Sequence, residues 1–225
     1  MFETWFLSQT GLGEPAWNMA LDEALLESRT AQPVLRFYSW SEPAATFGYS
    51  QHYSAVEPAT TLRPLIRRLT GGGLVPHDAD WTYSLIFPPA HSWYELKATE
   101  SYERVHQWVR RSFRKMEVTT ELASEKKTEI PGQCFVGWEK SDLLWHGKKI
   151  AGAAQRRTKN GLLIQGSIQP PPIGLAKADW QKAMCDSVGS APVRWEEFVA
   201  TRELSIQAEI LVEEKYAKKT YNQKR

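Results

Sequence analysis

Residues 67–78 read Arg-Arg-Leu-Thr-Gly-Gly-Gly-Leu-Val-Pro-His-Asp, and an apolar run, Trp81–Phe87, follows them. Three consecutive glycines pack nothing and weaken a sheet, but they let the backbone approach a ligand closely. Their bare N–H groups can hold an anion or a polarised carbonyl. The preceding arginines can form charge-assisted hydrogen bonds with phosphate or carboxylate. A plain hairpin turn is the alternative. With arginines before and His77-Asp78 after, we interpret the segment as a ligand-binding loop.

Hydrophobic periodicity on either side of this loop predicts helices interspersed with strands. Val34–Trp40 is rich in β-branched and aromatic residues, and strand-like runs recur at 63–69 and 81–87. Apolar residues at steps of three and four predict helices over 17–28 and 99–116.

The second half of the chain begins with a charged segment, 121–131, which we interpret as a mobile loop leading to Cys134. His146-Gly147 and Asn160-Gly161 suit turns with positive φ, so they predict an antiparallel meander from about 141 to 168. After the prolines at 170–172 we expect helices over 176–186, 195–202 and 205–221. Together these elements predict an α+β fold instead of a doubly wound parallel sheet.

Composition is that of an ordinary globular protein, with 42% hydrophobic and 24% charged residues. The 225 residues suit one large domain, which we take as 1–225. A net charge of +2 favours neither nucleic-acid nor membrane binding. Two cysteines cannot form a secreted disulfide framework, and no apolar stretch approaches transmembrane length, so we expect a cytoplasmic protein. The histidines lack zinc-site spacing, so we expect no metal.

Four motifs, in order along the chain, resemble the family of lipoate–protein ligases and octanoyltransferases. Residues 67–78 match its R-R-x-x-G-G-G-x-V-x-H-D element, which T-Y-S follows in the family and at 82–84 here. Residues 17–25 look like its first helix, while 35–43 and 46–51 resemble its R-x-Y-x-W-x-P and S/T-x-G-x-x-Q segments. Residues 147–155 are similar to its G-K-K-I-x-G-S-A-Q element.

The resemblance covers residues 15 to 170, approximately, and departs from the family at Pro76, where an aromatic or aliphatic residue is more usual. It implies a mixed, mostly antiparallel central sheet flanked by helices. The catalytic domains of biotin protein ligase and class II synthetases are relatives of that fold.

The resemblance also implies a nucleophile, Cys134. In the octanoyltransferase branch that resembles ligases, a Cys-Phe pair precedes the G-K-K-I-x-G motif, as Cys134-Phe135 does here, and that cysteine carries the acyl group. A free cysteine is more often an inert buried residue. We assign that inert role to Cys185, which lies in a helical segment without a charged partner.

Lys149 corresponds to the family's single catalytic or carbonyl-binding lysine. Strand alternation after the turn sends Lys149 and Lys148 to opposite faces, and we interpret Lys148 as solvated. A partly buried ammonium would lower the pKa of a neighbouring thiol from about 8.5. It would also stabilise a developing oxyanion on the acyl carbonyl.

Further residues are expected to bind the substrate. We take Arg68 as the inward arginine and Arg67 as structural. Adjacent strand residues face opposite ways, so His77 and Asp78 are not expected to pair, and His77 has a supporting role in the pocket wall. Small side chains after Gly152 would leave room for an acyl tail, whose methylenes each contribute about 0.8 kcal/mol when buried. The expected substrate-binding set is Arg68, Gly71, Gly72, Gly73, His77, Gly152, Ala154 and Gln155.

The sequence leaves three functions open, and it favours the first. An octanoyltransferase would move an octanoyl group from acyl carrier protein, through a Cys134 thioester, to a lipoyl-domain lysine. The acceptor would be a protein such as glycine cleavage H protein or a 2-oxoacid dehydrogenase E2, and neither ATP nor a cofactor is needed. A lipoate–protein ligase would instead activate lipoate with ATP and give Cys134 no required role. An octanoyl or lipoyl amidotransferase, or a non-catalytic binding protein, is the third possibility.

Overall fold

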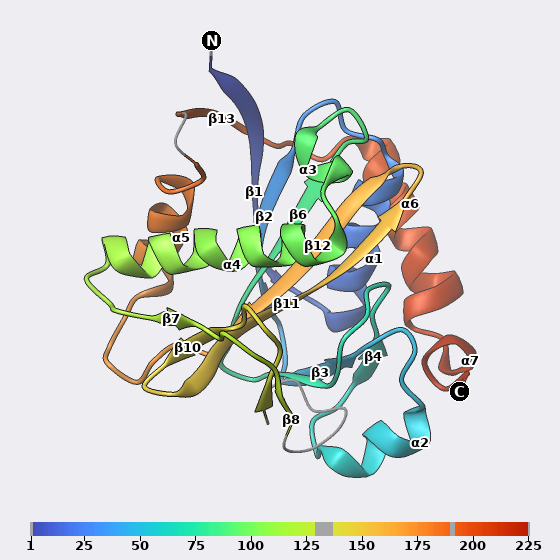
Figure 1. Ribbon diagram of the computed structural model, residues 1–225. Coiled ribbons are helices and arrows are strands. Elements are labelled where there is room, and N and C mark those ends of the chain that lie inside the picture. Colours follow the sequence, from blue (N-terminus) through green and yellow to red (C-terminus); the bar gives the residue numbers. More distant parts are fainter. Residues whose placement is uncertain (1, 129–136, 190–191, 225) are drawn as a thin grey trace.

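A computed structural model describes residues 2–128, 137–189 and 192–224 (Figure 1). A central eight-stranded sheet dominates the described part of the chain. Its strands are β1 (Glu3–Gly13), β2 (Val34–Trp40), β6 (Trp81–Phe87), β7 (Glu121–Leu122), β10 (Leu143–Trp145), β11 (Lys148–Thr158), β12 (Gly161–Ile168) and β13 (Val193–Glu197).

The strand order is β13-β1-β2-β6-β12-β11-β10-β7. β1 runs parallel to both β13 and β2, and the other neighbours are antiparallel. The expected α+β fold with a mixed, mostly antiparallel central sheet is therefore confirmed.

Two smaller sheets accompany the central one. In the first, β3 (Ala44–Phe47) lies between β4 (Leu65–Arg67) and β5 (Val75–His77). The second pairs β8 (Lys127–Thr128) with β9 (Gly137–Trp138). Because the three glycines join β4 to β5, the first small sheet positions the glycine loop.

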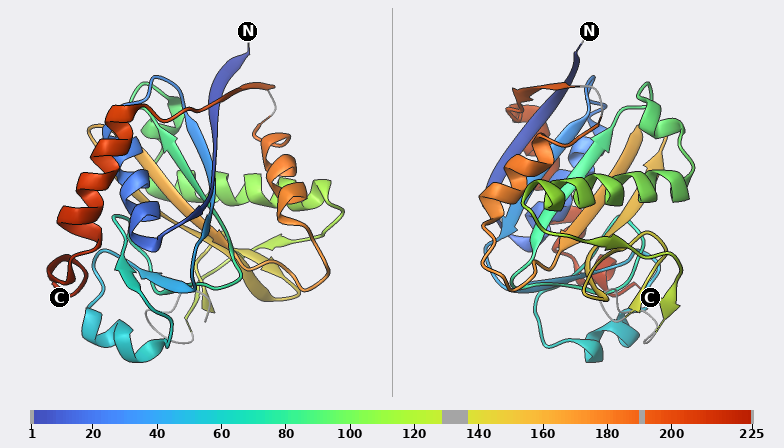
Figure 2. Two further views of the ribbon diagram at one scale, coloured as in Figure 1. Left: turned by 180° about the vertical axis from the view of Figure 1, so that it is seen from behind. Right: turned by 60° about the vertical axis from the view of Figure 1, so that its left-hand side comes forward.

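Helices cover both faces of the central sheet, as Figures 1 and 2 show: α4 and α5 lie on one face, α1 and α6 on the other. The helices are α1 (Pro15–Glu27), α2 (Tyr53–Val56), α3 (Ser92–Glu95), α4 (Ala98–Lys115), α5 (Lys177–Cys185), α6 (Arg202–Leu211) and α7 (Lys219–Asn222), with a 3-10 turn at Glu57–Ala59 and a π-helical turn at Val212–Tyr216. None of the described helices is long and apolar enough to cross a bilayer.

Strand alternation explains why the central strands are apolar at nearly every position. In β6, Leu85 and Phe87 belong to the core under α4, whereas Ile86 belongs to the core under α1. α4 buries a stripe at steps of three and four, including Trp108 and Phe113, against the first of these faces. Each large apolar side chain so buried contributes about 1.5–3 kcal/mol.

The structure corrects two expectations. Residues 195–202 do not form a helix: β13 pairs with β1, and Trp195 packs edge-on against Trp5 with ring centroids 5.9 Å apart. Pairing with a distant strand overrides the local helical tendency there. The predicted loop 121–131 is interrupted in its described part by β7, which pairs with β10, and by β8.

Candidate active site

Two of the motifs meet on one face of the central sheet. On β11, Gly152 and Ala154 share a face because strand residues alternate. Their cross-strand partners on β12 are Ser167 and Gln165. The Thr70 hydroxyl, at the start of the glycine loop, donates to Gln165 Oε1 over 2.7 Å. The glycine loop therefore lies beside the β11 residues that the sequence predicted to line the substrate pocket.

The conformation of the glycine loop requires glycine at particular positions. Gly72 has a φ of 85°, which favours a residue without Cβ. At Gly48, a Cβ would lie only 1.9 Å from the Gly72 carbonyl oxygen, so the two backbone segments could not approach as they do. At Gly71 no heavy atom of the described residues lies within 4 Å of the Cβ position. Among the described residues, the loop is thus braced on one side by Gly48 and is uncovered at Gly71.

Arg68 is buried and points inward, as expected, and it holds the loop. Its Nη2 donates to the carbonyl oxygens of Gly71 and Gly73 over 2.8 and 2.9 Å, and its Nη1 donates to Thr46 Oγ1 over 2.9 Å. Arg67 is also buried, and its guanidinium donates to backbone carbonyls such as Tyr49 O at 2.8 Å, in agreement with the structural role assigned to it.

His77 belongs to the same polar chain. Its Nε2 lies 2.7 Å from Thr46 Oγ1, and its Nδ1 lies 2.8 Å from Asp80 Oδ2. Because a carboxylate can only accept, the imidazole Nδ1–H donates to Asp80. The carboxylate partner of His77 is therefore Asp80, and the expectation that it does not pair with Asp78 is confirmed.

Asp80 anchors this chain in the sheet. Its Oδ2 also accepts hydrogen bonds from the hydroxyls of Thr82 and Ser167. Burial raises the pKa of Asp80, but the interaction with His77 and these hydrogen bonds outweigh burial and hold the pKa below its ordinary value. His77 in turn stacks on Trp40 with ring centroids 3.9 Å apart. His77 thus supports the loop indirectly, through its buried partners.

Lys149 lies near the start of β11, mostly buried, while its neighbour Lys148 is exposed, as strand alternation predicted. Its Nζ lies 2.7 Å from Asp142 Oδ2, and the two side chains are 6% and 0% exposed. A Cβ at Gly152 would come within 2.7 Å of Lys149 Cε and 2.8 Å of Nζ. Gly152 therefore leaves the space that the ammonium occupies.

A break in the register accompanies this lysine. Leu143 of β10 pairs with Ala151, but the next residue, Leu144, pairs with Lys149, so Ile150 is an extra residue opposite β10. Ile150 and Ala151 both belong to the core under α4. A bulge of this kind re-aims a side chain, which here brings Lys149 over Gly152.

The sequence did not predict the surroundings of Asp142. Its Oδ1 accepts the Tyr102 hydroxyl from α4, and its Oδ2 accepts the Glu139 backbone N–H over 2.7 Å. The available signal was the position of Asp142, shortly before the G-K-K-I-x-G element that begins at Gly147. Tyr102 gave no such signal, because it read as one member of an apolar helical stripe.

One other candidate lies elsewhere, and another falls outside the described residues. Gln155 is on the face opposite Gly152 and Ala154, where its amide bonds α4: Oε1 accepts from Ser101 at 2.8 Å, and Nε2 donates to Ala98 O at 2.7 Å. Cys134 falls at 129–136, outside the described residues.

Cys185 behaves as an inert thiol. It is partly buried on α5, and burial, with a smaller effect of Asp186, raises the pKa of its thiol to about 12. A thiol with that pKa is protonated at neutral pH and is a poor nucleophile.

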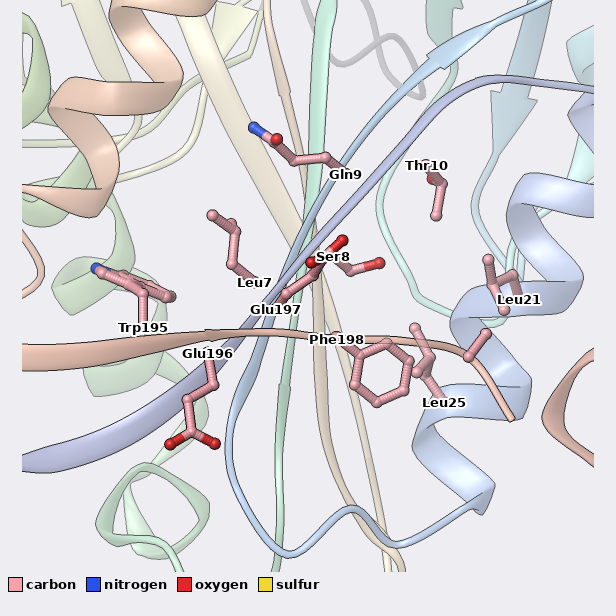
Figure 3. A pocket seen from close by; sticks show the side chains of 11 residues that line it. Leu7, Ser8, Gln9, Thr10, Leu21, Leu25, Trp195, Glu196, Glu197 and Phe198 are labelled. Atoms are coloured by element: carbon pink, nitrogen blue, oxygen red, sulfur yellow. The ribbon is translucent and has the colours of Figure 1, made fainter. Parts of the chain in front are cut away.

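A separate groove of about 570 Å³ lies between β1, β13 and the face of α1 (Figure 3). Its lining includes Leu7, Leu25 and Phe198, and the described residues around it contain none of the candidates. Within the described ranges, no group of three or more metal-ligating side chains is found either.

Comparisons with known proteins show similarity to one family. The family model "Lipoyl protein ligase A/B catalytic domain" matches residues 14–169. Octanoyltransferase LipM of Staphylococcus aureus is 36% identical over 183 residues, which cover 75% of this chain and 66% of that relative. The match thus spans just under two thirds of the relative's length.

Two solved structures share the fold. A lipoate-protein ligase A bound with ATP superposes with a TM-score of 0.77 at 21% identity, covering 99% of both chains. The bi-partite lipoate protein ligase of Thermoplasma acidophilum, described with its E2 lipoyl domain, gives a TM-score of 0.71 at 19% identity, covering 99% of this chain and 96% of that one.

Proposed function

Because the chain belongs to the lipoyl protein ligase A/B catalytic-domain family, we propose that it is an octanoyltransferase. It would take an octanoyl group from acyl carrier protein, hold it as a thioester on Cys134, and pass it to a lipoyl-domain lysine. The observation that carries this proposal is the 36% identity to a relative named as an octanoyltransferase. We place the protein in the cytoplasm.

In the proposed first step, the Cys134 thiolate attacks the carbonyl carbon of the carrier thioester. A new C–S bond forms, the bond to the carrier sulfur breaks, and the carrier leaves as a thiol with the proton that Cys134 gave up. The Lys149 ammonium, held 2.7 Å from Asp142, would stabilise the oxyanion that develops on the carbonyl. Backbone N–H groups of the loop from Gly71 to Gly73 would add to this stabilisation.

In the second step, the neutral amine of the acceptor lysine attacks the Cys134 thioester. The C–N bond of an amide forms, the C–S bond breaks, and the Cys134 thiolate regains a proton. A thioester is converted to an amide, so ATP is not consumed. The acceptor would be an E2 lipoyl domain, the domain described with the bi-partite ligase, or glycine cleavage H protein.

The substrate-binding residues take different roles in this proposal. Gly152 and Ala154 would leave room for the acyl chain beside the loop. Arg68 and His77 would act through the loop, because their polar atoms bond its carbonyls or the Thr46 hydroxyl. Gln155 would stabilise the packing of α4 on β11.

Intact mass spectrometry after incubation with octanoyl-carrier protein, with and without ATP, tests the proposal. A hydroxylamine-sensitive adduct of one octanoyl group should form without ATP, should be absent in Cys134→Ala, and should persist in Cys185→Ala. Modification of a lipoyl domain from free lipoate that requires ATP would instead indicate a ligase. Transfer from an octanoylated lipoyl domain, but not from carrier protein, would indicate an amidotransferase.

A further inference from the structure

The ammonium of Lys149 sits in a polar pocket built by three separate segments. β11 supplies the lysine and the gap at Gly152, the turn before β10 supplies Asp142, and α4 supplies the Tyr102 hydroxyl. The Asp142 carboxylate accepts from Tyr102 on Oδ1, and from Lys149 and the Glu139 N–H on Oδ2. Its orientation is therefore fixed from both ends.

Asp142 reaches this position through an unusual backbone. Ser141, the preceding residue, has a φ of 72°, a left-handed conformation that few residues with a Cβ adopt. The turn is held by Asp142 N donating to Glu139 O over 3.1 Å and by Ser141 N donating to Ala123 O over 2.8 Å. This unfavourable backbone conformation therefore occurs directly before the residue that contacts Lys149.

Among the described residues, His106 on α4 is a further titratable side chain that faces the carboxylate. His106 Nδ1 lies 2.8 Å from the Tyr102 carbonyl, so Nδ1 carries the proton, and Nε2 lies 3.7 Å from Asp142 Oδ1, beyond hydrogen-bond distance. Burial holds the pKa of His106 below its ordinary value, against the smaller opposing effect of Asp142. A neutral His106 leaves the charge of Asp142 to be balanced by Lys149.

Stability alone is a weak reason for this arrangement. A buried ion pair is often no more stabilising than apolar side chains of similar volume. Glycine within a strand and a left-handed serine are further local costs. The buried ion pair, the strand glycine and the left-handed serine are thus three unfavourable features around one ammonium. Such a combination is typical of a functional site, where side-chain geometry matters more than stability.

We propose that Asp142, held by Tyr102, is a positioning residue that fixes the Lys149 ammonium over Gly152 for acyl transfer. This role rests on the proposed function of Lys149, and Asp142 itself acts only through that lysine. α4, which carries none of the sequence-predicted site residues, thereby takes part in the site.

Amine labelling tests the contact without relying on catalysis. The wild-type chain, Asp142→Asn and Tyr102→Phe are treated briefly with a small acetylating reagent, and Lys149 and Lys148 are quantified by peptide mass spectrometry. Asp142→Asn should raise Lys149 labelling several-fold relative to Lys148, and Tyr102→Phe should raise it less. Asp179→Asn, the same change at an exposed site on α5, should leave the ratio unchanged. A constant ratio in both site variants would overturn the proposal.

A double-mutant cycle on octanoyl transfer tests the function. Asp142→Asn should lower kcat by about 10–100-fold, as expected when a catalytic group is misplaced by about 1 Å. The combination of Asp142→Asn with Lys149→Ala should be no slower than Lys149→Ala alone. Losses that multiply would show that Asp142 acts independently and would overturn the proposal. If the wild-type chain transfers no octanoyl group, the proposed function fails, whereas the labelling result still decides the contact.

Discussion

Replacing Gly152 with alanine should separate catalysis from stability. The new Cβ would lie 2.7 Å from Lys149 Cε and 2.8 Å from Nζ, whereas ordinary contacts begin at 3.4 Å. The end of the lysine must therefore retreat by roughly 0.6–0.7 Å, which lengthens its 2.7 Å contact with Asp142. Misplacement of a catalytic group by about 1 Å costs about 100-fold in rate, so we expect kcat to fall by about 10–100-fold.

The same substitution should leave the fold intact. The atoms that must move belong to the flexible end of one side chain, and alanine is favoured over glycine within a strand by about 0.5–1 kcal/mol. We therefore expect Tm to change by no more than about 4 °C. Octanoyl transfer and thermal unfolding would be measured on the same preparations, with Gly189→Ala as the matched control, because its added Cβ has no described atom beyond its chain neighbours within 4 Å.

A shorter acyl donor distinguishes the two ways in which the methyl group could act. If it displaces the ammonium, hexanoyl and octanoyl transfer should slow by the same factor. If it only blocks the acyl tail, the shorter chain should regain activity. Full octanoyl transfer by Gly152→Ala would refute the reasoning, because it would mean that the position of Lys149 over Gly152 has no part in catalysis.

Other consequences of the structure can be measured independently. Lys149→Ala should reduce acyl transfer by about two to three orders of magnitude, while Lys148→Ala should change stability by less than about 0.5 kcal/mol; equal, modest effects would show that the register is wrong. Asp80→Asn should lower the free energy of unfolding by about 3 kcal/mol at pH 7 in denaturant titrations. The pKa of Asp80 is lowered in the folded state. The difference in unfolding free energy between the wild-type chain and the variant should therefore be complete above the unfolded-state pKa of about 3.9, and it should vanish as pH falls through the folded-state pKa. A difference that does not depend on pH would contradict this reasoning. Alkylation of Cys185 should still accelerate with pH above 9, since burial raises its pKa to about 12, and a plateau near pH 8 would show a solvated thiol.

Local sequence patterns predicted those elements whose buried residues recur at the regular spacing of a strand or a helix. β2 and β6 have the expected bounds, and α4 differs by one residue at each end. β1 was missed and β13 was read as a helix, because the two strands pair across almost the whole length of the chain. No local window contains both partners of such a pair.

The site shows the same limit at the level of side chains. The motifs identified Lys149 and the glycine loop, but the partner of Lys149 depends on the bulge at Ile150 and the left-handed Ser141, which bring Asp142 into reach. The placement of Gln155 was accessible, because it is one residue out of phase with Ala154 on the same strand. There the resemblance outweighed the alternation in our prediction.

Peptide geometry explains why a buried arginine, Arg68, lies beside the three glycines. Arg68 draws the carbonyl oxygens of Gly71 and Gly73 toward itself. In a trans peptide the N–H points opposite to the carbonyl, so fixing the Gly71 oxygen aims the Gly72 N–H away from the guanidinium. Arg68 is fixed in turn through Thr46 and His77, whose partner Asp80 accepts hydrogen bonds from Thr82 and Ser167 in the sheet.

A second buried chain fixes the other end of the loop. Asp22 accepts from Gln165 Nε2 over 2.7 Å, and Gln165 Oε1 accepts from Thr70. Asp22 also forms a 2.7 Å ion pair with Arg36, and both side chains are fully buried. Glycine alone would make a loop with many conformations. In the proposed mechanism, rigid donors would stabilise an oxyanion better than mobile ones, and these buried anchors, which residues with side chains provide, would keep the loop rigid.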